Sequence, residues 1–354
     1  MISRRYVYIL ACVAVVVIGL LLATYNYSNM KRSNPSHIPA PLATQSVIAA
    51  TTQDGKPYQY VVLAFDGSRS LEEWRETLDF AKSMNESGTP IHFTYFINAI
   101  YLLTESNKNI YHPPKSPIGT SLIGYGSTSK EIGKRTALIN EAYQSGHEIG
   151  SHGVGHTPGY RWSIHDWKGE FTQFNMILDR ARAGIDTDVA LAVPATAIEG
   201  FRAPNLVVSN GLDSALDMFG FTYDASRIST IGVWPHKIAQ HWEMPLVSIP
   251  YDGKREILSM DYNFYVADSH AKDVLKKDTA LWQKKHDKML AAYINYFNMS
   301  YNSTRVPIFI GHHFSDWNDG LYWDVMKEAI KTICSKPKVR CTTYKDTLRY
   351  LQAR

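Results

Sequence analysis

The chain has 354 residues, of which 45% are hydrophobic and 20% are charged. This balance is ordinary for a globular protein and allows one large domain or two small ones. The net charge is only +4, from 37 basic and 33 acidic residues, and no dense Lys or Arg run is present, so the composition gives no case for nucleic acid as a partner.

The N-terminal segment is typical of a membrane anchor. Arg4 and Arg5 precede an uncharged apolar run over residues 6–24, and a run of roughly 19 residues is long enough to span a bilayer. Because the positive flank stays in the cytoplasm, we expect the rest of the chain to lie outside it, in a periplasmic, extracellular or luminal location. A cleaved signal peptide is the alternative, but residues 22–24 form a poor cleavage site.

Three parts are therefore expected. Residues 1–25 would form a cytoplasmic tip and a single transmembrane helix. Residues 26–57 are rich in Ser, Thr, Ala, Pro and Asn, which is typical of a flexible tether. Residues 58–354 would form the folded, exported domain.

Apolar periodicity predicts strands alternating with helices along this domain. In chain order the expected elements are strand 60–65, helix 70–85, strand 91–97, surface loop 105–129, helix 130–144, strand 148–151, helix 162–182, strand 200–202, helix 210–219, strands 221–223, 246–250 and 259–265, helix 273–297, strand 306–311, and helices 321–334 and 345–352. Such alternation predicts an α/β fold, a distorted (β/α) barrel of about seven to eight strands. A doubly wound open sheet is the alternative, although no GxGxxG or Walker motif favours it.

Two cysteines lie close together near the C-terminus. They are Cys334 and Cys341, whereas Cys12 lies inside the apolar run. In an exported domain such a pair indicates a disulfide that closes a small loop, and two free thiols are the alternative.

Two histidines lie four residues apart after the predicted strand 148–151. They are His152 and His156, and small residues around them leave room for a ligand to approach. Neutral imidazole is the commonest protein ligand for zinc-like metals, so the pair indicates a divalent metal site, most readily zinc. The H-x-x-x-H pattern alone is equally compatible with an incidental polar loop.

Further polar residues end or follow other predicted strands. They are Asp66, Arg202, Asp224 and the pair His312 and His313. In a barrel, chemistry is located at the carboxyl ends of the strands. One such carboxylate can be only a helix cap, but this many positions on successive strands predict a shared site.

These segments resemble the motifs of the polysaccharide deacetylase family, also called NodB homology or carbohydrate esterase family 4. That family has a T-F-D-D opening motif, then H-(S/T)-x-x-H, R-x-P, an Asp-bearing motif and a final L-x-H. The matching segments here are 64–68, 146–156, 202–204, 223–226 and 310–314. The fourth is closest in style to chitin deacetylase-like members, and the resemblance extends from Tyr60 to Leu351. It implies a distorted barrel and metal-dependent hydrolysis of N-acetyl amide bonds on an amino-sugar polysaccharide such as peptidoglycan or chitin-like material.

The resemblance also implies roles for the catalytic residues. Asp66 would be the base that accepts a proton from water, and Arg202 would orient it. His313 would protonate the departing amine, and Asp224 would hold its imidazolium. His313 is preferred over His312 because a compact turn is expected to follow it.

One departure from the family concerns the metal. The second Asp of the opening motif, a metal ligand in the family, is Gly67 here, so His152 and His156 would hold zinc with solvent alone. Asp66 itself, Ser68 or another carboxylate, with Asp261 the best candidate, could supply a third ligand. Alternatively, the site holds no metal.

Two functions are therefore weighed. The first is the polysaccharide N-deacetylase. The second, motivated by Gly67, is a membrane-tethered carbohydrate-binding protein that lacks catalysis and grips a glycan with aromatics such as Trp162, Trp234 and Trp317. A scaffold without a ligand would leave the polar residues at the strand ends unexplained.

Overall fold

The computed structural model describes residues 55–253 and 255–354. The predicted anchor over 1–25 lies outside the described residues, as does most of the predicted tether over 26–57. Within the described part of the chain, no helix combines the length and the apolar character needed to cross a membrane.

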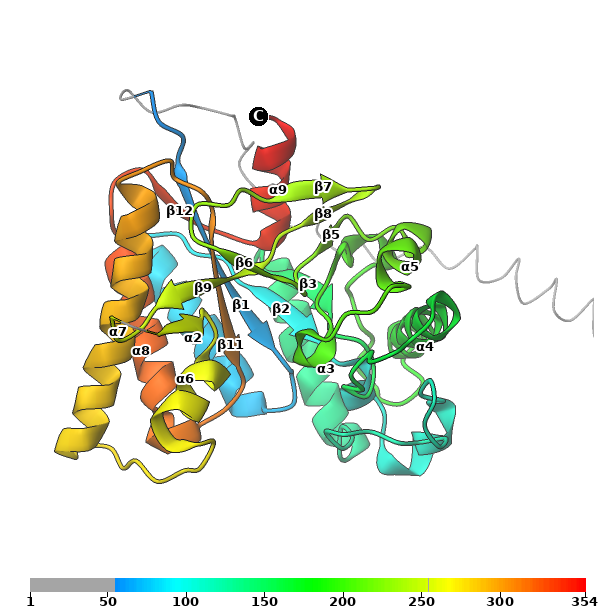
Figure 1. Ribbon diagram of the computed structural model, residues 1–354. Coiled ribbons are helices and arrows are strands. Elements are labelled where there is room, and N and C mark those ends of the chain that lie inside the picture. The colour runs from blue at the N-terminus through cyan, green and yellow to red at the C-terminus, as the bar shows by residue number, and fades with distance from the viewer. Residues whose placement is uncertain (1–54, 254) are drawn as a thin grey trace, which may run out of the picture. The chain divides into compact units, whose positions relative to one another are not determined.

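A curled sheet of nine strands, largely parallel, forms the centre of the domain (Figure 1). Its strands are β1 (Gln59–Asp66), β2 (Thr94–Ile97), β3 (Glu148–Ser151), β4 (Gly200–Phe201), β5 (Tyr223–Asp224), β7 (His236–Ile238), β8 (His241–Glu243), β11 (Ile308–His313) and β12 (Val339–Cys341). The main path runs β11-β1-β2-β3-β4-β5-β8-β7, and β12 pairs with β1. Only the β7–β8 pair on this path is antiparallel.

A smaller sheet adjoins β11. Its strands are β6 (Ile228–Thr230), β9 (Leu246–Pro250) and β10 (Glu256–Leu258), in the order β10-β9-β6. The Gly311 N–H donates to the Ser259 carbonyl at 2.8 Å, and Met260 forms a bridge with Gly311.

The predicted α/β architecture is confirmed, and the curled nine-stranded sheet fits a distorted barrel.

Helices cover the outside of the curled sheet (Figure 1). They are α2 (Leu71–Glu86), α3 (Ser129–Gln144), α4 (Ile164–Arg182), α5 (Leu212–Phe219), α6 (Asp261–Ser269), α7 (Ala280–Tyr301) and α8 (Trp317–Cys334). The last helix, α9 (Tyr344–Gln352), instead packs against the other face of β1 through Tyr344 and Leu348. Short 3-10 helices occur at Ala99–Leu102, Glu105–Ile110, Ala195–Ala197 and Pro204–Leu206. Figure 1 shows α7 packed beside α8, and α4 beside α5 at the other end of the sheet.

The predicted strand 259–265 is wrong, because most of it belongs to helix α6. Asp261 is the first residue of this helix, where the free N–H groups favour a carboxylate, and its Oδ1 accepts a hydrogen bond from the Tyr262 N–H at 2.7 Å. The predicted helix 273–297 begins later, as α7, after Thr279 caps it by accepting from the Trp282 N–H at 3.2 Å.

The two faces of β1 are both buried, as the continuous apolar run predicted. Val62 and Ala64 belong to one hydrophobic cluster, which we call the inner cluster. Leu63 and Phe65 belong to the cluster that includes residues of the covering helices. Because side chains alternate along a strand, Asp66 projects to the same face as Ala64, which we call the inner face of the sheet.

The predicted disulfide between Cys334 and Cys341 is confirmed. It links the last residue of α8 to the last residue of β12, with their Cα atoms 5.7 Å apart.

Candidate active site

Asp66 and His313 end two neighbouring parallel strands. They are partners in the register between β1 and β11, and adjacent strands lie about 4.8 Å apart. Phe309 of β11 belongs to the inner cluster, so His313, four residues later, projects to the same face as Asp66. The structure therefore brings these two predicted residues together.

Arg202 follows β4 and is completely buried. Its Nη1 donates to Asp66 Oδ1 at 2.7 Å, its Nη2 donates to the Tyr344 hydroxyl at 2.8 Å, and its Nε donates to the Ala225 carbonyl at 3.3 Å. The guanidinium carbon lies 4.4 Å from the centre of the Phe96 ring. These contacts fix the planar guanidinium against one oxygen of Asp66, as the predicted orienting role requires.

The environment keeps Asp66 ionised. Burial alone would raise the pKa of its carboxyl, but nearby positive charge, above all that of Arg202, holds this pKa below its ordinary value. A carboxylate in this state can accept a proton at neutral pH.

Asp261, at the start of α6, holds His313. Its Oδ2 accepts from the His313 backbone N–H at 2.8 Å, and its Oδ1 lies 2.7 Å from His313 Nδ1. Burial alone would lower the pKa of His313, but the charge and hydrogen bond of Asp261 and the charge of Asp66 hold this pKa above its ordinary value. Asp261, which the sequence suggested as a third metal ligand, is instead the partner of this imidazole.

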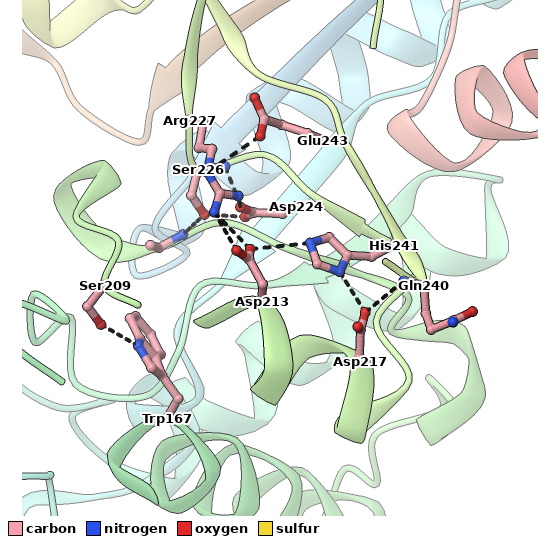
Figure 2. Close-up of polar contacts among 11 residues, drawn as sticks. Trp167, Ser209, Asp213, Asp217, Asp224, Ser226, Arg227, Gln240, His241 and Glu243 are labelled. Atoms are coloured by element: carbon pink, nitrogen blue, oxygen red, sulfur yellow. Dashed lines mark hydrogen bonds and ion pairs between the residues drawn. The ribbon is translucent and has the colours of Figure 1, made fainter. Parts of the chain in front are cut away.

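Asp224 does not contact His313, in contrast to the predicted arrangement. Its neighbour in β5, Tyr223, belongs to the inner cluster, so Asp224 projects to the opposite face. There its Oδ1 accepts from the backbone N–H of Ser226 at 3.1 Å and from the Ser226 hydroxyl, and its Oδ2 pairs with Arg227 at 3.1 Å (Figure 2).

This network continues away from the inner face. Arg227 also pairs with Asp213 at 2.8 Å and with Glu243 at 3.4 Å, and His241 Nδ1 lies 2.7 Å from Asp217 Oδ1 (Figure 2). Burial raises the pKa of Asp224 to about 6.

The network still reaches Arg202 through the backbone. The Ser226 hydroxyl oxygen accepts from the Ala203 N–H at 2.8 Å, and the adjoining Ala225 carbonyl accepts from Arg202. Asp224 therefore supports the segment that carries Arg202 rather than the predicted acid.

His312 lies on the other face of β11 and is fully buried. Its Nε2 is 3.1 Å from the Tyr293 hydroxyl oxygen, and its Nδ1 is 3.6 Å from Asp261 Oδ2. Burial lowers its pKa to about 4. The strand alternation thus separates the two histidines, and only His313 shares the inner face with Asp66.

His152 and His156 lie close together after β3, with ring centres 5.0 Å apart. His152 Nδ1 donates to the Arg202 carbonyl at 2.7 Å, which fixes the tautomer and leaves the lone pair on Nε2. Burial lowers the pKa of His152 to about 3 and also lowers that of His156. Both imidazoles are therefore neutral, the form that binds metal.

Two side chains hold the loop between these histidines. Asn98 Nδ2 donates to the His152 carbonyl at 2.7 Å, and Glu170 Oε1 accepts from the Val154 N–H at 2.7 Å. Glu170 Oε2 accepts from the Tyr111 hydroxyl at 2.9 Å, and burial raises the pKa of Glu170 to about 7. Nothing in the spacing of the sequence pointed to Asn98, Glu170 or Tyr344, which reach the site only through the tertiary fold.

The donor set fits a divalent ion only in part. The two neutral imidazoles suit zinc, but in residues 55–253 and 255–354 no group of three His, Cys, Asp or Glu side chains is placed to hold a metal. Gly67 adopts a left-handed conformation with φ +80°, and a Cβ built there has no atom within 4 Å. The position that carries a carboxylate in the resembling family thus has room for a side chain but supplies none.

The fold is similar to that of a solved structure. A protein from Mycobacterium smegmatis assigned as a polysaccharide deacetylase matches with a TM-score of 0.52 over 86% of this chain and 93% of that one, at 14% identity. The chain has the polysaccharide deacetylase fold. No protein-family profile and no curated protein matches its sequence.

Two other solved structures match with lower TM-scores. A family 4 carbohydrate esterase from Streptomyces lividans matches over 78% of this chain and 90% of its own, at 12% identity and a TM-score of 0.39. A pseudoenzyme of the same family from Bacillus anthracis matches over 82% of this chain and 66% of its own, at 8% identity and a TM-score of 0.42.

Proposed function

We propose that the chain hydrolyses N-acetyl groups on an amino-sugar polysaccharide, either peptidoglycan or a chitin-like polymer. The observation that carries this proposal is the placement of two opposite ion pairs, Asp66 with Arg202 and His313 with Asp261, on the ends of adjacent strands. Amide hydrolysis needs a base that activates water and an acid that protonates the leaving nitrogen, and these pairs suit the two tasks.

Asp66 would act as the base. Its pKa is held below the ordinary value, so it is ionised and can take a proton from a water that attacks the acetyl carbonyl. Arg202 is fully buried and bonded through all three groups of its guanidinium, so it keeps the carboxylate oriented without competing for the proton.

His313 would act as the acid. Its pKa is held above the ordinary value, which favours the protonated form that can donate to the amine nitrogen as the C–N bond breaks. Asp261 lies 2.7 Å from Nδ1, which keeps the Nε2 proton directed away from that carboxylate and stabilises the imidazolium.

His152 and His156 would hold a divalent ion, for which we propose zinc. When bound, such an ion lowers the pKa of water and polarises a carbonyl. With two protein ligands the ion would be held more weakly than in a site with three.

For the location, we propose that an N-terminal helix anchors the folded domain outside the cytoplasm, where N-acetylated polysaccharide is its partner. The positive residues Arg4 and Arg5 before the apolar run support this orientation. A reporter enzyme that is active only outside the cytoplasm, fused to the C-terminus, should then be active, and an inactive reporter that is active when exported by a control leader would contradict the orientation.

A second function is a glycan-binding protein without catalysis. It is favoured by Gly67 and by the lack of a three-ligand metal group among the described residues. It would bind the polysaccharide while releasing no acetate.

One experiment separates the two functions. The full chain is assayed for bound metal, for binding of N-acetylglucosamine oligomers, and for acetate released from these oligomers and from peptidoglycan, with Asp66→Asn beside it. Asp79→Asn is the matched control, because this side chain on α2 is 62% exposed. Acetate release that Asp66→Asn abolishes and Asp79→Asn preserves supports the hydrolase. Glycan binding by both variants without acetate release from the parent supports the binder.

A further inference from the structure

Tyr344, the first residue of α9, belongs to the inner cluster and is completely buried. Its ring stacks on that of Tyr223, with centres 5.2 Å apart and planes at 9°, and on that of Phe309, with centres 4.9 Å apart and planes at 14°. Its backbone N–H donates to Thr94 Oγ1 at 3.0 Å. Residues of β2, β5 and β11 thus fix this side chain on the inner face, where close packing leaves it little freedom to move.

The hydroxyl of Tyr344 contacts the arginine that orients the predicted base. Arg202 Nη2 donates to this hydroxyl at 2.8 Å, and Arg202 Nη1 donates to Asp66 Oδ1 at 2.7 Å. Burial raises the pKa of Tyr344 to about 12, so the hydroxyl is neutral and accepts from the guanidinium without adding a negative charge. The two terminal nitrogens of Arg202 therefore bond acceptors on two different elements, α9 and β1.

An arginine beside a carboxylate often bonds both carboxylate oxygens through two parallel hydrogen bonds. Here the guanidinium carbon lies over the Phe96 ring, 4.4 Å from its centre. A planar cation can turn in its own plane over such a ring with little loss of contact, so its in-plane hydrogen bonds set its angle. The Tyr344 hydroxyl is the acceptor that directs Nη2 of Arg202 away from Asp66.

We propose that Tyr344 is a positioning residue that holds Arg202 on Oδ1 of Asp66 and so keeps the second oxygen, Oδ2, available to the attacking water. In that step the water oxygen bonds the acetyl carbonyl carbon, the carbonyl electron pair moves to its oxygen, and the water proton passes to Oδ2. An Oδ2 bonded to the guanidinium would be a weaker base, because the hydrogen bond stabilises its ionised form. The inference rests on the proposed function for the reaction, and it adds a residue that acts on the base through Arg202.

Tyr344→Phe tests this role, because it removes the hydroxyl and keeps the ring. Nη2 of Arg202 loses its acceptor in a buried place, so the guanidinium should turn and bond both oxygens of Asp66, as a crystal structure of the variant would show. With an N-acetylglucosamine pentamer as substrate, kcat should fall by roughly 10- to 100-fold. KM should stay near the parental value, because the change lies in the buried core.

Tyr95→Phe is the matched control. Tyr95 on β2 is also completely buried, but it belongs to the cluster that includes residues of the covering helices, and its hydroxyl donates to Thr77 Oγ1 at 2.9 Å. This variant should keep both the parental pairing of Arg202 with Asp66 and the parental kcat. A loss of kcat that is equal in the two variants would reflect only a missing buried hydrogen bond and would overturn the positioning role.

The crystal structures separate this inference from the hydrolase proposal. Pairing of Arg202 with both oxygens of Asp66 in Tyr344→Phe, together with no acetate release by the parent, supports the effect of Tyr344 on Arg202 and contradicts the hydrolase. Acetate release by the parent overturns the positioning role alone if Tyr344→Phe keeps either the parental pairing or the parental kcat. A structure of the parent in which Arg202 already bonds both oxygens also overturns it, and this test does not depend on the folding of any variant. Unchanged pairing in Tyr344→Phe without acetate release by the parent overturns both proposals.

Discussion

Asp66 and His313 are register partners across the β1–β11 ladder, and their surroundings shift their pKa values in opposite directions. Arg202 bonds the carboxylate and Asp261 bonds the imidazole, so each member of the pair has a partner of opposite charge. These surroundings favour an ionised carboxylate and a protonated imidazole side by side on adjacent strands.

The opposite shifts predict a bell-shaped pH profile of kcat/KM. The base works above its pKa and the acid works below its own, so the rate should fall only below the ordinary aspartate value of 3.8 and only above the ordinary histidine value of 6.5. Asp261→Asn removes the charge that raises the pKa of His313, so the alkaline limb should move to lower pH. An alkaline limb that stays in place in Asp261→Asn would show that another group is the acid.

Gly67→Asp should strengthen metal binding. The position has open space for a side chain, and Asp tolerates its left-handed conformation at a cost of about 1 kcal/mol. A third ligand beside His152 and His156 should raise the affinity for zinc by roughly tenfold or more, as measured by competition with a chelating dye. Gly88→Asp is the control, because Gly88 also has a positive φ and open space but follows α2. Equal zinc affinity in Gly67→Asp and Gly88→Asp would contradict a metal site at the two histidines.

Ser226→Ala should disturb Arg202 from a distance. It leaves the buried Ala203 N–H without its acceptor, which should lower the free energy of unfolding by about 1–3 kcal/mol. If the Asp224 network positions Arg202, kcat should fall while KM changes little, because binding of the polymer does not use this network. Ser303→Ala removes an exposed hydroxyl that donates to the Met299 carbonyl. It should change neither the free energy of unfolding nor kcat. A loss of stability without any loss of kcat would limit the network to a structural role.

Removal of the disulfide should destabilise the domain without affecting the site. The Cys334–Cys341 bond closes a loop with a sequence separation of 7, for which loop-closure entropy predicts about 2 kcal/mol. The double variant with serine at both positions should lose this free energy of unfolding in urea. Its kcat/KM for acetate release should equal that of the parent. Unfolding at the same urea concentration as the parent would argue against the bond.

Much of the site could be predicted from the sequence because strand ends are local features. Asp66, His152 and Arg202 end or follow buried strands, and parallel strands in a curled sheet collect their carboxyl ends at one edge. The spacing of His152 and His156 was visible without any knowledge of the fold.

The positions of Asp224 and Asp261 could not be predicted, because they depend on tertiary contacts that local sequence patterns do not reveal. Tyr223 and Asp224 form a strand of two residues, so no alternation pattern indicates which of them faces inward, and Asp224 was given the role that Asp261 fills. The Met260–Gly311 bridge delivers Asp261 to His313, and this pairing joins segments about 50 residues apart. The apolar run around Asp261 suggested a strand, but packing of Phe264 and Tyr265 against the core allows a helix there.

A double-mutant cycle on acetate release tests most directly whether Asp66 and His313 act as one acid–base unit. The full chain is compared with Asp66→Asn, His313→Gln and the double variant on N-acetylglucosamine oligomers, with pentamer binding measured in parallel. Each single change should lower kcat by about 10²- to 10⁴-fold while binding is retained, and the double variant should be hardly slower than the slower single variant. Losses that multiply in the double variant, or single variants that release acetate at the parental rate, would contradict the account.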